Sequence, residues 1–273
     1  MKVLELFAGT RSIGKAFEAR GHEVYSVEWD KNFDNIDLYA DIGTLTVSDV
    51  VALCGGIPDV IWASPDCSTF SVAAISRHRR KNPETGSLDP ISDYARFCDD
   101  VDQNVLKLIR ELQPTYWFIE NPRGGMRKMA WMQGLPRYTV TYCKYETDKP
   151  LDQRRMKPTD IWTNHPDPDF IPHCKNGDPC HAAAPRGSMT GTQALRGSKN
   201  RSVIPPLLCE HIVDICEKEY RWCTACGEPM HEGYCINDGH EYFCSDDCLF
   251  GYYSAEEYEK LCEQDCGYWT QWF

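Results

Sequence analysis

The chain has 273 residues, of which 42% are hydrophobic and 26% are charged, and these ordinary values exclude disorder as a description of the whole chain. No apolar run approaches the roughly 18 residues that a membrane helix needs, and the apolar segment 1–8 lacks a cleavage-like pattern, so we expect a cytoplasmic protein without a membrane partner. The net charge of −12 argues at first against a nucleic-acid partner, because acidic proteins repel phosphate.

The charge and the cysteines are unevenly distributed. Residues 223–273 contain one Lys and no Arg against 11 Asp and Glu, a net charge of −10, which leaves residues 1–222 at −2. Seven of the 15 Cys lie in the same terminal segment. So many Cys in a chain of this size without an export signal indicate metal binding or catalysis rather than disulfides. We therefore expect a first domain of residues 1–221 and a cysteine-rich domain of residues 222–273.

Short apolar runs alternate with helix-like stretches along the first domain. Strands are expected over residues 3–7, 22–27, 59–63 and 115–119, and helices over residues 12–20 and 94–112, the second of which Pro114 ends. This alternation predicts an α/β fold, a doubly wound Rossmann-like domain with a parallel sheet. Residues 76–92 are polar and contain two prolines, so we expect a mobile surface loop there. Residues 164–200 show little periodicity and predict no regular element.

Two loops at the expected carboxyl edge of the sheet suit a nucleotide-like ligand. The turn at Gly9 follows a strand and precedes a helix, where a ligand can approach the backbone and the helix N-terminus. Glu28 ends the next strand, where a carboxylate can accept hydrogen bonds from ribose hydroxyls, and Trp29 beside it can stack on an adenine. Asp41 and Ile42 follow the next expected strand. Each of these features is also compatible with a solvated strand end or a structural turn.

Further loops at the same edge carry reactive side chains. Cys67, in the segment ASPDCSTFS, follows the strand DVIWA, a position that favours a nucleophile over a buried structural thiol. Glu120, in ENPR, follows the apolar strand TYWFI, and a carboxylate there is costly unless it is paired or used. The segment QRRMK supplies Gln153, Arg155 and Lys157 as polar or cationic donors.

Taken in chain order, these motifs resemble those of the DNA (cytosine-5) methyltransferase family, and most closely its compact bacteriophage-type members. The matching segments are LFAGT, the acidic Glu28, the pair Asp41 and Ile42, SPDC, ENP, QRRMK and the closing segment SVIPPLLCEHI. The resemblance extends from residue 4 to about residue 213. It implies S-adenosylmethionine as the cofactor, DNA as the partner and a cytosine flipped out of the duplex as the substrate.

The resemblance also implies roles for individual residues. Cys67 is the expected nucleophile toward carbon 6 of cytosine, Glu120 holds the ring at N3 and the exocyclic amine, and Arg155 adds a cationic donor to the carbonyl oxygen. The residues expected to bind the cofactor are Phe7, Ala8, Gly9, Thr10, Arg11, Ser12, Glu28, Trp29, Asp41, Ile42, Ser64, Pro65 and Ser202. Residues 76–92 correspond to the family's mobile loop, and its basic side chains, Arg77, Arg79, Arg80 and Lys81, suit phosphate contacts.

Several positions depart from the family pattern. Arg11 replaces the usual second glycine of the cofactor loop, so a side chain can also meet the cofactor's carboxylate. Asp66 replaces the proline before the nucleophile, and its charge should raise the thiol pKa. Ser202 replaces the usual asparagine of the closing motif. Only residues 164–200 occupy the place of the long region with which the family reads DNA sequence, which keeps RNA or a free cytosine nucleotide open as the substrate. A nucleic-acid-binding protein with weak catalysis is a further alternative.

The cysteine-rich domain predicts a zinc finger. Cys223 and Cys226 form a zinc-knuckle pattern, and Cys244 and Cys248, 18 positions later, can share the first turn of a helix, so the four thiolates complete a tetrahedral site like that of a treble clef. Cys235, His231 and His240 are alternative ligands. The acidity of this domain favours a protein partner over direct DNA contact. The terminal aromatic residues, Tyr268, Trp269, Trp272 and Phe273, suit either a plug onto the first domain or a protein interface.

A second group of metal-binding residue types lies in the short region 164–200. His173, Cys174, Cys180 and His181 could bind zinc, although their spacing matches no common ligand pattern. A compact, loop-rich segment without metal is the alternative.

Overall fold

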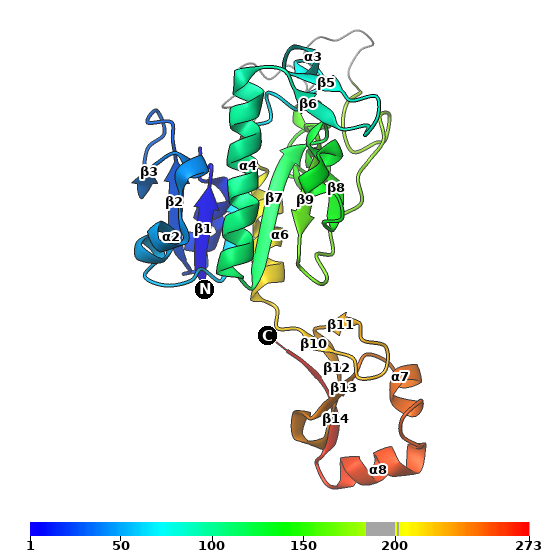
Figure 1. Cartoon of the computed structure of the whole chain (residues 1–273). Coiled ribbons are helices and arrows are strands. Elements are labelled where there is room, and N and C mark those ends of the chain that lie inside the picture. Colours follow the sequence, from blue (N-terminus) through cyan, green and yellow to red (C-terminus); the bar gives the residue numbers. More distant parts are fainter. Residues whose placement is uncertain (184–199, 201, 273) are drawn as a thin grey trace. The chain divides into compact units, whose positions relative to one another are not determined.

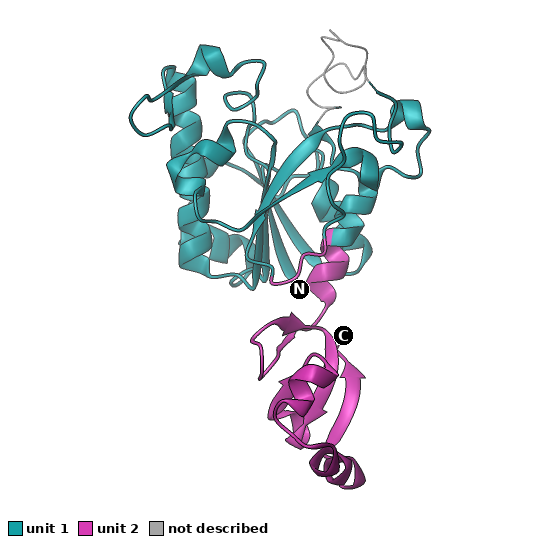
Figure 2. Ribbon diagram, turned by 90° about the vertical axis from the view of Figure 1, so that its right-hand side faces the viewer, with its two compact units in different colours: residues 1–165, 170–211 teal, residues 166–169, 212–273 magenta. Residues whose placement is uncertain are grey.

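The computed structural model describes residues 1–183, 200 and 202–272, which divide into two compact units (Figures 1 and 2). Unit 1 consists of Met1–His165 and Phe170–His211, and unit 2 of Pro166–Asp169 and Ile212–Phe273. The division falls inside helix α6 (Pro206–Glu217), upstream of the change in composition at residue 222.

Unit 1 is built on a seven-stranded sheet with the strand order β3-β2-β1-β4-β7-β9-β8. The strands are β1 (Lys2–Leu6), β2 (Glu23–Glu28), β3 (Leu38–Tyr39), β4 (Val60–Ala63), β7 (Tyr116–Pro122), β8 (Arg137–Thr141) and β9 (Pro158–Thr163). The five strands from β3 to β7 run parallel, and β9 and β8 are antiparallel to their neighbours. Because the order steps outward from β1 in both directions, the predicted doubly wound α/β fold is confirmed.

Helices cover both faces of this sheet. Over residues 1–183, the α-helices are α1 (Ser12–Ala19), α2 (Val47–Cys54), α3 (Ile75–His78) and α4 (Asp93–Leu112), and the short 3₁₀ helices are η1 (Ile42–Thr44), η2 (Met126–Lys128), η3 (Ala130–Met132), η4 (Tyr142–Tyr145) and η5 (Leu151–Gln153). Side chains alternate between the faces of a strand. Leu4 and Leu6 of β1 therefore join the core shared with α2 and α4, whereas Glu5 between them bonds to the backbone of α1 on the other face.

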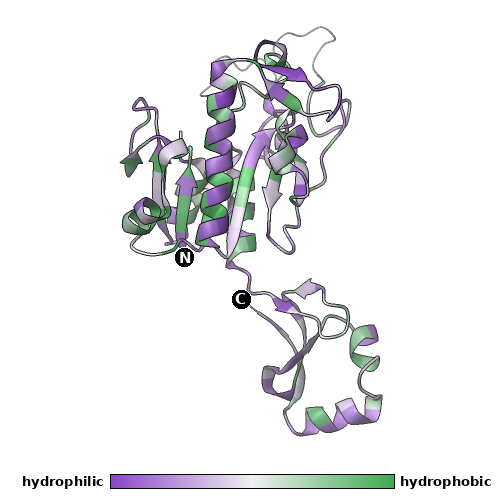
Figure 3. Ribbon diagram, viewed as in Figure 1, coloured by the Kyte–Doolittle hydropathy of each residue, from purple (hydrophilic) through white to green (hydrophobic). Residues whose placement is uncertain are grey.

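Helix α4 shows how the sequence sets an element's limits. The Ser92 side chain accepts a hydrogen bond from the Ala95 N–H and caps the start, while Gln113, in a left-handed conformation before Pro114, ends the helix. The helix carries hydrophobic and hydrophilic residues in alternation along its length (Figure 3). Its apolar positions, among them Val101 and Val105, are buried in the core of unit 1, as the helical spacing predicts.

The segment 76–92, expected as a mobile surface loop, contains regular secondary structure. Helix α3 leads into strand β5 (Arg79–Lys81), which pairs antiparallel with β6 (Leu88–Pro90). The prolines do not interrupt this pairing, because Pro83 lies in the turn and Pro90 lies at the end of a two-stranded ribbon. The structure therefore shows a hairpin.

Unit 2 contains a three-stranded antiparallel sheet in the order β13-β12-β14 and a separate two-stranded ribbon. Its elements after α6 are β10 (Arg221–Trp222), β11 (Pro229–Met230), β12 (Glu232–Ile236), η6 (Asn237–Gly239), β13 (Glu241–Phe243), α7 (Asp246–Phe250), α8 (Ala255–Glu263) and β14 (Gly267–Gln271). A small core, which includes Ile236, Phe243 and Leu249, holds them together.

The terminal aromatic residues take part in this sheet. Tyr268 and Trp269 lie on β14 and are each 47% exposed, and Trp272 packs against the core of unit 2. Phe273 lies outside the described residues. Among the helices that the structure describes, none is both long and apolar enough to span a membrane.

Candidate active site

The loops that carry the predicted site residues meet at the carboxyl edge of the parallel sheet. Backbone hydrogen bonds continue the sheet past the strand ends, from the Ala8 N–H to the Val27 carbonyl over 3.1 Å and from the Ser64 N–H to the Leu6 carbonyl over 3.3 Å. These bonds hold the segment after β1 between those after β2 and β4. Ligands of open α/β sheets bind at this edge.

The loop after β1 has an unusual backbone. Phe7, Gly9 and Arg11 all have positive φ angles, of 56°, 48° and 56°. Glycine adopts this conformation at little cost, but Phe7 and Arg11 are strained in it, and such strain is concentrated at ligand-binding sites. In this conformation of the loop, the Gly9 N–H donates a hydrogen bond to the Glu28 carboxylate at 3.0 Å.

Glu28 is fixed at the end of β2. One carboxylate oxygen accepts hydrogen bonds from the backbone N–H groups of Trp29 at 2.9 Å and Asp30 at 3.0 Å, and the other accepts the bond from Gly9. The second oxygen has one described partner, so it retains capacity for a ligand hydroxyl. Trp29 is 67% exposed beside it and can offer its ring to a flat ligand.

The other predicted cofactor residues are divided between exposed and structural positions. The Asp41 side chain caps η1 by accepting a hydrogen bond from the Gly43 N–H at 2.8 Å, and Ile42 is buried next to it. Ser64 accepts a hydrogen bond from the indole N–H of Trp62 at 2.8 Å. Ser202 is exposed on the closing segment.

Arg11 and Glu5 organise the start of α1. The Arg11 guanidinium pairs with Glu18 at 2.5 Å. Glu5 lies buried under the helix and accepts hydrogen bonds from the N–H groups of Ile13 at 3.2 Å and Gly14 at 3.1 Å. Burial raises the pKa of Glu5 to about 8, against the opposing effect of these two bonds.

Cys67 lies in a tight turn after β4. Asp66 stabilises this turn, because its carboxylate accepts hydrogen bonds from the Ser68 N–H at 2.7 Å and the Ser68 hydroxyl at 2.6 Å, and another from the Tyr94 hydroxyl of α4. Burial raises the pKa of the Cys67 thiol; Lys157 lowers it, and Glu120 and Asp66 raise it further. The predicted effect of Asp66 on the thiol is therefore confirmed in direction, although burial is the larger cause.

Glu120 is part of β7 and is buried next to this thiol. Its Oε1 accepts a hydrogen bond from the Tyr142 hydroxyl at 3.1 Å. The Asn121 amide donates to the Pro65 carbonyl at 3.0 Å, which joins the Glu120 segment to the Cys67 segment. Gly124 tightens the same junction, since a Cβ there would lie 2.5 Å from the backbone oxygen of Phe70.

Arg155 and Lys157 have different positions. The Arg155 guanidinium is buried, pairs with Glu146 at 2.5 Å and donates to the Val203 carbonyl at 2.8 Å. Lys157, two residues on, is the cation that lowers the pKa of Cys67, and its ammonium lies 4.5 Å from the centre of the Tyr142 ring. The sequence predicts Lys157 only as one of several donors, whereas in the structure it lowers the pKa of the thiol and Arg155 pairs with the buried Glu146.

Comparisons with known proteins bear on this site. No family model matches the chain. A "Probable DNA (cytosine-5)-methyltransferase" of Frog virus 3 is 27% identical over 237 residues, which cover 79% of this chain and 100% of the relative. The chain is therefore similar, over most of its length, to a protein of that description.

Solved structures of methyltransferases align with part of the chain. A prophage-encoded protein of Escherichia coli, described as a DNA modification methyltransferase, has a TM-score of 0.42 and 16% identity, and Dnmt2 of S. pombe has a TM-score of 0.39 and 14% identity. Both alignments cover 60% of this chain, but they span only 46% and 48% of the solved chains.

One of the basic residues expected to contact phosphate, Arg79, lies instead in the interior of unit 1. The Arg79 side chain is fully buried and pairs with Asp99 of α4 at 2.6 Å. It also donates from Nη2 to the Thr69 hydroxyl at 2.9 Å, and its guanidinium lies 4.0 Å from the centre of the Phe70 ring. The prediction for Arg79 is wrong, because a partner carboxylate on α4 draws it inward; Arg77, Arg80 and Lys81 are exposed.

The four predicted zinc ligands come together in unit 2. The ligand atoms of Cys223, Cys226, Cys244 and Cys248 all lie within 4.8 Å of one another, and the Sγ of Cys244 is 3.6 Å from those of Cys226 and Cys248. Among the described residues, neither Cys235, His231 nor His240 joins this group.

Local structure accounts for this convergence. Cys223 and Cys226 lie between β10 and β11, and Ser245 caps α7 between the other two ligands. Burial opposes ionisation of Cys223, but hydrogen bonds from the backbone N–H groups of Cys226, Cys244 and Ala225 outweigh it and lower its pKa to about 6. The group could therefore bind zinc.

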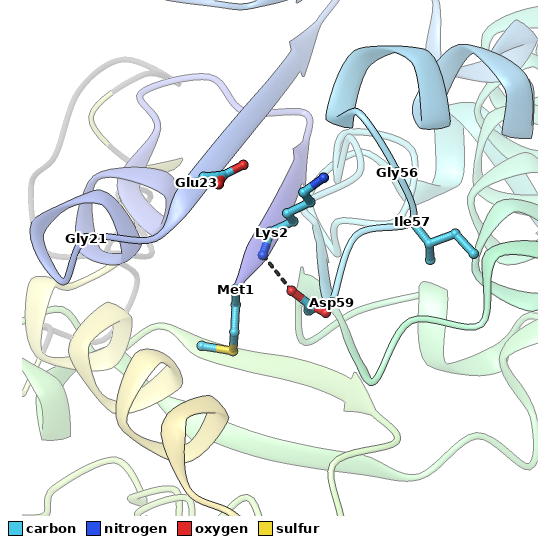
Figure 4. A pocket seen from close by; sticks show the side chains of 7 residues that line it. All are labelled: Met1, Lys2, Gly21, Glu23, Gly56, Ile57 and Asp59. Atoms are coloured by element: carbon cyan, nitrogen blue, oxygen red, sulfur yellow. Dashed lines mark hydrogen bonds between the residues drawn. The ribbon is translucent and has the colours of Figure 1, made fainter.

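A pocket lies away from these residues, at the amino ends of the strands (Figure 4). Met1 and Lys2 of β1, Glu23 of β2 and Asp59 line it, and Asp59 accepts a hydrogen bond from the Lys2 backbone N–H at 2.6 Å. Gly21, Gly56 and Ile57 complete the lining. It contains none of the predicted site residues, so we assign it no role in the site.

Proposed function

We propose that the protein is a DNA cytosine-5 methyltransferase that transfers a methyl group from S-adenosylmethionine to carbon 5 of a flipped cytosine through a covalent Cys67 adduct. The observation that carries this proposal is the junction of the Cys67 and Glu120 segments, joined by the Asn121–Pro65 hydrogen bond of 3.0 Å, with Lys157 as the cation that lowers the pKa of the thiol. A nucleophile, a carboxylate and a cation are the groups that addition to a cytosine ring requires.

The loops around Gly9 fit S-adenosylmethionine. Glu28 offers an acceptor for the ribose, Trp29 an exposed ring for the adenine, and Asp41 with Ile42 a polar and an apolar contact beside it. The backbone from Phe7 to Ser12, together with Ser64, Pro65 and Ser202, completes the proposed binding residues. When bound, the cofactor supplies an electrophilic sulfonium methyl group.

The residues of the chain then act on the cytosine. The Cys67 thiolate attacks carbon 6, and the electron pair of the 5,6 double bond makes carbon 5 nucleophilic. Glu120, fixed by Tyr142, holds the ring at N3 and the exocyclic amine and stabilises the enamine. After transfer, solvent water takes the proton from carbon 5, the thiolate leaves carbon 6, and the 5,6 double bond is restored.

Lys157 takes the electrostatic role beside the thiol in this proposal. Its positive charge lowers the pKa of Cys67, and in our proposal it also meets the developing charge on the cytosine carbonyl. Arg155, which sequence reasoning assigned to that carbonyl, acts in our proposal through position: its bonds to Glu146 and the Val203 carbonyl join the QRRMK segment to the closing segment.

DNA is proposed as the partner of unit 1. Carbon 6 of a stacked cytosine is not accessible to a side chain, so the base must leave the duplex, at a cost of a few kcal/mol. The exposed side chains of Arg77 on α3 and of Arg80 and Lys81 on β5 supply phosphate contacts near the Cys67 loop. We propose that the enzyme acts in the cytoplasm of a bacterial or phage-infected host cell. A viral origin of the aligned relative agrees with action in an infected cell.

The test uses the full chain, radiolabelled S-adenosylmethionine and duplex DNA. We expect label at carbon 5 of cytosine and no transfer by Cys67→Ala. DNA with 5-fluorocytosine should trap the adduct, because fluorine at carbon 5 cannot leave as a proton, and the complex should survive denaturing electrophoresis with the wild type only. Label transfer by Cys67→Ala would refute the covalent mechanism.

A second candidate substrate is RNA or a free cytosine nucleotide. It is favoured by the short segment, residues 164–200, that stands where the family reads DNA sequence. The same assay with RNA and with dCMP separates the two candidates, since label in either one and none in DNA would replace DNA as the substrate.

For unit 2 we propose a treble-clef-like zinc finger with Cys223, Cys226, Cys244 and Cys248 as ligands. Four thiolates leave no open position, so the metal would be structural. The acidic surface of this unit repels phosphate, and we propose that it binds a protein partner, with the exposed Tyr268 and Trp269 as part of the contact. A binding assay in which Trp269→Ala retains all partners captured by the wild type would refute that role.

A further inference from the structure

Unit 1 contains a second group of thiols and an imidazole, separate from the proposed active site. The ligand atoms of Cys143, Cys174, Cys180 and His181 all lie within 4.8 Å of one another. The Sγ of Cys143 is 3.3 Å from that of Cys174 and 3.6 Å from that of Cys180. His181 Nδ1 is 3.7 Å from the Cys174 sulfur and 3.4 Å from the Cys180 sulfur.

Backbone and side-chain hydrogen bonds bring these four residues together. Cys143 lies on η4, directly after β8, while the other three belong to a segment that forms neither helix nor strand up to residue 183. This segment is attached to the surroundings of η4 by the Cys174 N–H, which donates to the Thr141 hydroxyl at 2.9 Å. Further along, the Ala182 N–H donates to the Leu151 carbonyl at 3.0 Å. These two hydrogen bonds hold the segment with Cys174, Cys180 and His181 beside η4.

The distances agree with tetrahedral zinc. With bonds of about 2.3 Å to sulfur and about 2.0–2.1 Å to nitrogen, tetrahedral geometry places two sulfur ligands about 3.8 Å apart and a sulfur and a nitrogen about 3.6 Å apart. The four separations given above fall within half an ångström of these values. The terminal cluster, which the sequence already identifies, shows sulfur separations of 3.6 Å.

A disulfide explains the group less well. It would require an S–S distance of about 2.05 Å and would join only two of the three thiols. The third thiol and the imidazole would then remain beside it without a reason to converge. Three soft sulfur atoms and one imidazole nitrogen are instead a common donor set for structural zinc.

We propose that Cys143, Cys174, Cys180 and His181 form a structural zinc site in unit 1. Four protein ligands leave no position for a substrate, so the metal would fix the fold. His173, which the sequence places in this group, is exposed and takes no part, and Cys143 replaces it. The ligand pattern was not evident because 30 residues separate Cys143 from Cys174.

The site would also position a residue of the active site, an inference that rests on the proposed function. Tyr142, which donates to Glu120 at 3.1 Å, directly precedes the ligand Cys143 on η4. Zinc bound at Cys143 would restrict η4 and with it the Tyr142 hydroxyl. Tyr142 is thus a positioning residue whose own support is the metal site.

The proposal is tested by the zinc content of the purified full chain. Two zinc ions per chain are expected, one for each cluster. Cys180→Ser and His181→Ala should each reduce the content to one, as should the pair Cys226→Ser and Cys244→Ser in unit 2. The matched control His173→Ala should retain two.

Cobalt substitution provides a second measurement that does not depend on loss of a ligand. His181→Cys should keep two metal ions and change the Co²⁺ absorption of the unit 1 site from that of three thiolates and one imidazole to that of four thiolates. Unchanged zinc in both Cys180→Ser and His181→Ala, or a Cys143–Cys174 disulfide found by mass spectrometry in the protein as purified, would overturn the proposal. Zinc content does not depend on methyl transfer, so failure of the zinc proposal can be distinguished from failure of the proposed function.

Discussion

The buried ion pair between Arg79 and Asp99 supports the Cys67 loop, and its removal should destabilise unit 1. The pair is bidentate, with Nη2–Oδ1 and Nη1–Oδ2 distances of 2.6 and 3.1 Å, and Arg79 also donates from Nε to the Thr69 carbonyl at 3.2 Å. Asp102, one turn along α4, is buried too, and burial followed by the charge of Asp99 raises its pKa well above the usual range. Arg79 pairs with Asp99, and its positive charge lowers the pKa of Asp102 against these two effects.

The expected magnitude follows from the burial of both partners. The Arg79 side chain is 0% exposed and that of Asp99 8%. Removal of one partner of such a pair costs about 3–5 kcal/mol, because the other charge stays buried without compensation. Arg79→Ala should therefore reduce the free energy of unfolding of unit 1 by that amount. Arg80→Ala, at the adjacent exposed position, should change it by less than about 0.5 kcal/mol.

Urea unfolding followed by hydrogen exchange on peptides from α4 and β7 measures unit 1 separately from unit 2. In the double variant Arg79→Met/Asp99→Leu the uncompensated charge is absent, so its cost should be smaller than the sum of the two single costs. A loss below about 1 kcal/mol in Arg79→Ala, or additive costs in the double variant, would refute the reasoning. DNA binding should show the opposite pattern: Arg80→Ala should reduce the salt dependence of binding by about one phosphate contact without changing stability.

Three further predictions concern other parts of the structure. Burial raises the pKa of Glu146, but Arg155 and Lys149 outweigh it and lower this pKa. The ion pairs of Glu146 should therefore stabilise unit 1 above the ordinary carboxyl pKa, and this stabilisation should be lost as the pH falls through the lowered pKa. Acid titration of the stability of unit 1 should show this loss in the wild type and not in Glu146→Gln. Cys226→Ser should remove the hydrogen-exchange protection of unit 2 peptides and leave that of β1 and β4 unchanged, because the four proposed zinc ligands of the terminal cluster all belong to unit 2. Gly124→Ala should reduce the rate of methyl transfer at least tenfold. A Cβ 2.5 Å from the Phe70 carbonyl oxygen must push the Cys67 and Glu120 segments apart, and a tenfold loss of rate corresponds to about 1.4 kcal/mol of activation free energy. Equal rates in the variant and the wild type would contradict this prediction.

The sequence allowed the sheet and the reactive loops to be predicted because their pattern is local. Cys67 follows one short apolar strand and Glu120 lies toward the carboxyl end of another, and parallel strands bring these ends to one edge of the sheet. Cys223 and Cys226 were likewise found from a spacing of three residues.

Contacts between distant segments could not be predicted in this way. The inward turn of Arg79 depends on Asp99, 20 residues later on α4, and a basic hairpin with one buried arginine has the same composition as one with none. Cys143 became a proposed zinc ligand only when the fold brought η4 to the segment around Cys174. In QRRMK, the burial of Glu146 decides which cation lies near the thiol, and no spacing within the motif contains that information.

Asp66 provides a test of how this chain controls its nucleophile. Burial, Glu120 and Asp66 raise the pKa of Cys67, and only Lys157 among the named neighbours lowers it. The thiolate is the reactive form, so the rate of methyl transfer should rise with pH until the thiol has ionised. Asp66→Asn removes one negative charge and retains an oxygen that can accept the hydrogen bond from the Ser68 N–H, so the turn should persist.

The rate profile of Asp66→Asn should therefore shift toward lower pH, and that of Lys157→Met should shift toward higher pH. The assay is single-turnover methyl transfer from pH 6 to 10, with alkylation of Cys67 by iodoacetamide in the absence of DNA as a direct measure of the thiolate. Asp152→Asn, an exposed substitution of the same kind, is the charge control and should leave both profiles in place. If alkylation shifts and methyl transfer does not, ionisation of Cys67 does not limit the reaction; if neither shifts, Asp66 supports only the turn, and the raised pKa of the thiol must come from burial and Glu120.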